Sequence, residues 1–194
     1  LLLSKYGFFD YKDYIDYQGE DYFSLAHIIL MIILTALLIM LTILLRKTKE
    51  KNIKIFLKII SITMICLEIF KISWETYFDI KLGHGFNYDG LLPLYTCSMF
   101  MYVLPFAAFS KNKKIQNIAY AFLTTISVFG GLTNFYLLQI LHTYPLFTYA
   151  TFASLFYHFM MSFTGLLILA TKTYTLRLKD IVIGWIPVLI FSLI

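Results

Sequence analysis

Long apolar stretches alternate with short polar segments along most of the chain. Each of five such stretches is close to the ~20 residues that a helix needs to cross the hydrocarbon core of a membrane. They cover residues 24–45, 55–78, 92–109, 117–140 and 149–170. A sixth begins near Ile181 and is too short to span, so we expect the chain to continue beyond both printed ends. The pattern predicts an all-α fold, a polytopic transmembrane helical bundle of six spans with the last one incomplete.

The charges of the loops predict the orientation of these spans. Every second loop is basic, and short cytoplasmic loops collect Lys and Arg. The basic residues of these loops are Arg46, Lys47, Lys49, Lys51, Lys54, Lys111, Lys113, Lys114, Lys172, Arg177 and Lys179. We therefore expect the N-terminus outside. The net charge of +5 arises from these loops, so it indicates membrane topology and contact with anionic lipid, with no nucleic-acid partner.

Residues 1–23 differ from the rest of the chain because they combine acidic and aromatic side chains. We interpret them as an extracellular interfacial segment, since Tyr and Trp anchor chains at the headgroup level. A lid over a site in the outer leaflet is the alternative. Residues 24–194 are then expected to form a single six-helix transmembrane domain.

Three ionisable side chains lie within the second apolar stretch. Glu68, Lys71 and Glu75 are spaced by three and four residues, which places them on one face of a helix. A charged residue at the bilayer centre costs roughly 2.5–3.5 kcal/mol on insertion scales, so such residues usually face a polar cavity or each other. Two carboxylates and one ammonium group leave one negative charge unbalanced, which indicates a further partner. An ion-paired cluster that only holds helices together is the alternative.

Three further residues share the outer half or the centre of the predicted membrane with this stripe: His27, Cys97 and His158. Trp74 is interpreted as an interfacial anchor rather than a catalytic group, and Asn134 is a polar group at membrane depth. Cys97 is expected one turn inside the third helix, where free backbone N–H groups favour a thiolate; an inert packed thiol is the alternative. His158 is deep enough to need a hydrogen-bond partner. Gly130 and Gly131 predict close helix packing. No metal-ligand spacing and no cofactor fingerprint is present, so we expect neither a metal nor a cofactor.

Several of these residues carry a resemblance to a known family. The charged second span with Trp74, the run LPLYTCS at residues 92–98, the following Leu104-Pro105 and the basic turn at 111–114 resemble the bacterial YwaF-type integral membrane proteins. His27 and His158 stand where that family carries histidine. The family is similar to a eukaryotic multi-pass acyltransferase that places polyunsaturated chains on ether phosphatidylethanolamine.

The resemblance implies a lipid acyltransferase in the bacterial plasma membrane that acts in an outer-leaflet pocket. Cys97 would accept the acyl group of a membrane phospholipid as a thioester, and His158 or His27 would assist as base and acid. The expected substrate-binding residues are Glu68, Lys71, Trp74, Glu75 and Asn134.

Two other functions stay open at this point. Six short spans also resemble the substrate-binding membrane subunits of energy-coupling-factor vitamin transporters, and the charged stripe of span two would then bind a small zwitterionic solute. In a non-enzymatic membrane scaffold, the polar residues would only fix the packing of the helices.

Overall fold

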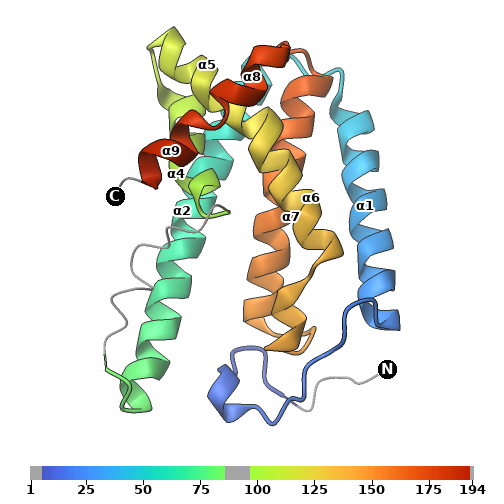
Figure 1. Cartoon of the computed structure of the whole chain (residues 1–194), viewed down its shortest axis with the longest axis vertical. Helices are drawn as coiled ribbons and strands as arrows, with labels where there is room; N and C mark the ends of the chain where they lie inside the picture. The colour runs from blue at the N-terminus through green and yellow to red at the C-terminus, as the bar shows by residue number, and fades with distance from the viewer. Residues whose placement is uncertain (1–5, 86–96, 193–194) are drawn as a thin grey trace.

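The computed structural model describes residues 6–85 and 97–192, and within these ranges all regular elements are helices (Figure 1). In chain order they are η1 (Lys12–Tyr14), α1 (Leu25–Leu45), α2 (Glu50–Lys81), α4 (Met99–Phe109), α5 (Lys113–Phe122), η2 (Leu123–Ser127), α6 (Val128–Tyr136), η3 (Gln139–His142), α7 (Tyr149–Ala170), α8 (Leu178–Ile183) and α9 (Ile186–Phe191). The predicted all-α fold is confirmed.

Length and hydropathy make this bundle a membrane protein. Three helical stretches are long and apolar enough to cross a bilayer: α1, the stretch Lys113–His142 that joins α5 to η3, and α7. The longest helix is α2, with 32 residues, and its apolar part contains the charged stripe of Glu68, Lys71 and Glu75. The sixth apolar stretch begins as two short helices, α8 and α9, because the chain turns at Gly184 and Trp185.

The basic loops gather at one end of the bundle. The last turns of α1 and α7 lie near the first turns of α2 and α5 at the top of Figure 1, and α8 lies there too. The opposite end holds the N-terminal segment and the last turn of α2. This arrangement agrees with the grouping of loops that the sequence predicts. The cytoplasmic position of the basic end stays a prediction.

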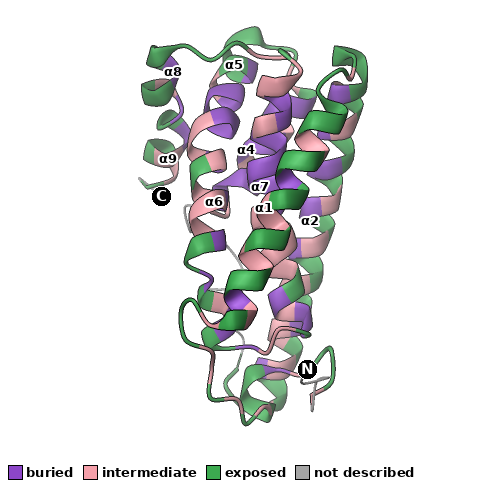
Figure 2. Ribbon diagram, turned by 90° about the vertical axis from the view of Figure 1, so that its right-hand side faces the viewer, coloured by how far each residue is buried: buried purple, intermediate pink, exposed green. Residues whose placement is uncertain are grey.

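The buried core lies among α2, α4, α5 and α7, around side chains such as Leu57, Phe100, Leu104 and Phe122. The helix α1 packs on α6 and α7 and exposes most of its residues outward (Figure 2). Because its exposed side chains are apolar, this surface suits lipid rather than water.

Close packing of α6 on α7 depends on Gly131. A Cβ atom at this position would meet the carbonyl oxygen of His158 and the backbone and hydroxyl of Ser162. The neighbouring Gly130 has only the methyl group of Met161 nearby, at 3.5 Å from an added Cβ. The predicted close approach is therefore confirmed at Gly131 and absent at Gly130. The contact at Gly131 sets the position of α7, and with it the position of His158, along the axis of the bundle.

Candidate functional site

A cavity of about 200 Å³ lies between α2, α7 and the start of α4. It is bounded by side chains from four parts of the chain, and we call it the thiol cavity. Its lining residues are Leu67, Glu68, Lys71, Trp74, Glu75, Cys97, Ser98, Ile140, Tyr144, Ala150, Ala153, Ser154, Tyr157 and His158. Six of the eight residues that the sequence singles out line this one space.

The charged stripe of α2 faces the cavity. Lys71 Nζ lies 3.6 Å from Glu68 Oε1, and the Glu68 side chain is only 10% exposed. The same carboxylate oxygen has no hydrogen-bond partner among the described residues. Glu75 lies one turn further along and forms no ion pair within the described ranges. The two carboxylates and one ammonium group therefore leave acceptor capacity for a ligand that carries a positive or protonated group.

His158 lines the cavity in a defined tautomer. Its Nδ1 lies 2.8 Å from the carbonyl oxygen of Ser154, one turn earlier in α7. A carbonyl only accepts hydrogen bonds, so Nδ1 carries the proton and Nε2 keeps a free lone pair. No hydrogen bond to Nε2 occurs among the described residues. The half-buried imidazole thus has the partner that its depth requires, and its second nitrogen is able to take a proton.

Cys97 lies in the turn that leads into α4, with a free and partly exposed thiol. The expected position one turn inside the helix is wrong, because α4 begins at Met99. Residues 92–96 of the predicted span lie outside the described residues. The carbonyl oxygens of Cys97 and Ser98 accept the N–H groups of Phe100 and Met101 at 3.0 Å. The thiol therefore stands just before the helix N-terminus.

Tyr157 holds this turn against α7, and sequence reasoning gave it no role. Its hydroxyl lies 3.2 Å from the carbonyl oxygen of Ser98 and 3.4 Å from that of Cys97, to which it donates. It also accepts the N–H of Met101 at 3.2 Å. The need of a buried tyrosine for a partner was the available signal, but the sequence does not reveal which segment supplies that partner.

An aromatic cluster closes the outer wall of the cavity. Trp74 is buried and donates its Nε1–H to the carbonyl oxygen of Phe9 at 3.1 Å. Tyr11 stacks on Phe78 and donates to Asp79 Oδ1 at 2.9 Å. Burial and this carboxylate raise the pKa of Tyr11 well above its ordinary value of 10.0. The N-terminal segment is thus packed onto α2, and Trp74 belongs to a buried cluster rather than to an exposed interfacial anchor.

Two expected site residues lie away from the thiol cavity. His27 is buried, accepts the N–H of Phe23 at 3.0 Å through Nδ1, and contacts the carbonyl oxygen of Phe135 at 3.1 Å through Nε2. Both ring nitrogens are therefore engaged in joining α1 to α6, which leaves neither for proton transfer. Asn134 of α6 does not line the cavity, and its Oδ1 is buried without a hydrogen bond in the described residues. Neither residue is therefore part of the candidate site.

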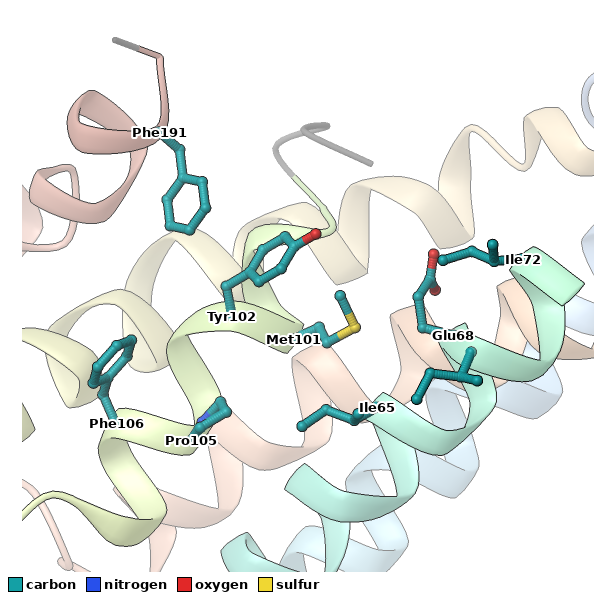
Figure 3. A pocket seen from close by; sticks show the side chains of 9 residues that line it. Ile65, Glu68, Ile72, Met101, Tyr102, Pro105, Phe106 and Phe191 are labelled. Atoms are coloured by element: carbon teal, nitrogen blue, oxygen red, sulfur yellow. The ribbon is translucent and has the colours of Figure 1, made fainter. Parts of the chain in front are cut away.

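A second space adjoins the first. It is an apolar groove of about 540 Å³ between α2, α4 and α9, and Glu68 lines both spaces (Figure 3). Within residues 6–85 and 97–192, no group of three or more His, Cys, Asp and Glu side chains is arranged to hold a metal ion. The described arrangement thus offers a thiol, an imidazole and a charged stripe beside a groove open to apolar ligands.

Comparison with known proteins identifies the family. No curated protein and no solved structure matches the chain. The model of the TMEM164 family matches residues 22–194, which include all the spans and every residue of the thiol cavity. The chain belongs to the TMEM164 family.

Proposed function

We propose that this protein is a lipid acyltransferase of the plasma membrane that carries the acyl group on Cys97. The observation that carries the proposal is the shared cavity: Cys97 comes from the turn before α4 and His158 from α7, and the charged stripe of α2 completes the same space. A nucleophile and a base in one enclosed site are the minimum that covalent acyl transfer requires.

The first half-reaction loads the thiol. His158 Nε2 takes the proton of Cys97, and the thiolate attacks the carbonyl carbon of a phospholipid ester. The ester C–O bond breaks, and the departing glycerol oxygen receives the proton from the imidazolium. The products are a thioester on Cys97 and a lysophospholipid.

The second half-reaction runs the same steps in reverse on a different lipid. His158 removes the proton of a lysophospholipid hydroxyl, whose oxygen attacks the thioester carbonyl. The C–S bond breaks, and the Cys97 thiolate regains the proton. The two half-reactions together need no oxidant, reductant or cofactor.

Other lining groups suit the charges that these steps create. The ammonium group of Lys71 is a donor for the oxyanion of the tetrahedral intermediate. Glu75, which has no ion pair among the described side chains, suits the ammonium of a lipid headgroup. The volume of about 200 Å³ fits a headgroup and its ester rather than a whole lipid.

The test is acyl transfer in reconstituted vesicles. The vesicles contain a diacyl phospholipid with a deuterated chain and a lysophosphatidylethanolamine acceptor, and mass spectrometry follows the label. Wild type and the Cys66→Ala control should transfer the chain. Cys97→Ala and His158→Gln should lose at least about a hundredfold in rate, as is typical when a nucleophile or a general base is removed. Wild-type transfer by Cys97→Ala, or no transfer by wild type to any acceptor, would overturn the proposal.

The binding of a small zwitterionic solute is the second candidate, because Glu68, Lys71 and Glu75 line one cavity. In that case Lys71→Met would abolish solute binding and Cys97→Ala would leave it intact. The two substitutions therefore separate the candidates.

A further inference from the structure

The groove beside the thiol cavity has the composition of a lipid-facing surface. We call it the α2–α4 groove; it is lined by Ile65, Glu68, Ile69, Ile72, Met101, Tyr102, Pro105, Phe106 and Phe191. Ile69 is 60% exposed and Phe106 is 52% exposed. Apart from the Glu68 carboxylate and the Tyr102 hydroxyl, its side chains are apolar. The groove therefore opens toward the surroundings of the bundle, which at this depth are acyl chains.

One end of the groove lies beside the reactive thiol. Glu68 belongs to both spaces, and Met101 follows Cys97 by four residues, in the first turn of α4. The N–H of Met101 bonds to the Tyr157 hydroxyl, which also bonds to the carbonyl oxygen of Cys97. Glu68 is therefore the residue that the linings of the groove and of the cavity share.

The other end of the groove points toward the basic end of the bundle. Figure 3 shows Ile72 and Glu68 at one side and Phe106 and Phe191 at the other. Phe191 of α9 stacks on Tyr102 with ring centroids 5.1 Å apart. With the N-terminus outside, as the sequence predicts, this direction leads from the outer leaflet inward, toward the cytoplasmic side. That is the direction in which the chain of an outer-leaflet lipid extends from its ester.

The lining distinguishes a lipid chain from a helix of another protein. Membrane helices pack through small residues that let backbones approach, whereas large side chains line this groove. Along α2 the groove extends from Ile65 to Ile72, roughly 10 Å at about 1.5 Å per residue. A spanning helix is about 30 Å long and would need a longer seam. The apolar composition of the groove fits an acyl chain.

We propose that the α2–α4 groove holds the acyl chain whose ester carbonyl enters the thiol cavity, and that Phe106 and Phe191 set the accepted chain length. This inference rests on the proposed acyl transfer. It adds a chain-binding site to the reaction.

The first test measures chain selection in vesicles with equal amounts of myristoyl, palmitoyl, stearoyl and arachidoyl donors. Ile69→Trp, which fills the groove, should shift transferred chains toward the shorter donors, and Phe191→Ala should shift them toward the longer ones. The matched control is Ile62→Trp: Ile62 is 57% exposed on the same helix but does not line the groove. Its chain profile should equal that of wild type. An unchanged profile in both groove variants, with transfer intact, would overturn the proposal.

A second test needs no chemistry at Cys97. A phospholipid with a diazirine near the end of one chain is photolysed with Cys97→Ala protein in vesicles, and labelled peptides are mapped. Labelling should concentrate on the peptides of α2 and α4 that line the groove, and Ile69→Trp should reduce it severalfold. Equal labelling of the lipid-exposed helix α1 would overturn the assignment. Groove labelling without transfer in wild type would instead refute the proposed catalysis and leave the chain site standing.

Discussion

At the scale of single residues, the candidate site depends on hydrogen bonds that fix the direction of reactive groups. The bond from Nδ1 to the Ser154 carbonyl oxygen leaves Nε2 as the nitrogen of His158 that can take a proton. The Tyr157 hydroxyl ties the turn of Cys97 to α7. Thiol and imidazole are thus positioned by neighbouring residues of one helix.

Tyr157→Phe should slow acyl transfer roughly tenfold while leaving most of the stability in place. The change removes a neutral hydroxyl whose hydrogen bonds are worth about 1 kcal/mol each, and it lets the Cys97 turn move away from His158. Transfer rates and thermal melting in detergent measure the two effects. An unchanged rate would show that the hydroxyl does not position the thiol.

The Glu68–Lys71 pair should show strong coupling in a double-mutant cycle. Lys71→Met leaves a poorly exposed carboxylate without its ammonium partner, so the free energy of unfolding should fall by about 1–3 kcal/mol. Lys71→Met combined with Glu68→Gln should restore most of the loss, because no unpaired charge stays behind. If the double variant is as unstable as the sum of the single ones, the pair is not coupled.

At the scale of secondary-structure elements, the seam between α6 and α7 sets the position of His158. Gly131→Ala should lower the melting temperature by several degrees, because its Cβ meets the backbone of α7 and overpacking costs roughly 1–3 kcal/mol. Gly130→Ala is the matched control in the same helix and should be neutral or slightly stabilising. Equal melting temperatures of the two variants would contradict the described seam.

The N-terminal segment covers the outer wall of the cavity through Tyr11 and Phe9. Tyr11→Ala should therefore speed the labelling of Cys97 by a water-soluble maleimide in a Cys66→Ala background. The matched control Tyr14→Ala alters an exposed ring of the same segment and should leave the rate unchanged. Equal rates for wild type and Tyr11→Ala would show that the segment does not shield the thiol.

The hydrogen bond between Tyr11 and Asp79 should hold this segment equally well at neutral and mildly alkaline pH. The pKa of Tyr11 is raised in the folded protein, so its hydrogen bond to Asp79 stabilises the folded state below about pH 10, the ordinary value of the phenol, and weakens as pH rises through the folded pKa. The stability of the segment toward protease should thus be equal at pH 7 and pH 9.

At the scale of the whole molecule, the hydropathy pattern and the charges predicted the helices but did not predict the contacts between them. The apolar stretches predicted the helices, and the spacing of Glu68, Lys71 and Glu75 predicted their common face. The convergence of that face with Cys97 and His158 depends on how α2, α4 and α7 pack, and hydropathy carries no such information. His27 illustrates what the sequence cannot predict. Its predicted depth in the membrane is the same whether the side chain joins two helices or lines a cavity.

The most direct measurement is the intact mass of the purified protein after incubation with phospholipid vesicles, before and after hydroxylamine. Wild type should gain the mass of one acyl chain and lose it to hydroxylamine, because thioesters are cleaved under conditions that leave amides intact. Cys66→Ala should behave in the same way, and Cys97→Ala should gain nothing. An acyl adduct that persists in Cys97→Ala, or a wild-type mass that never changes across donors, would contradict the account.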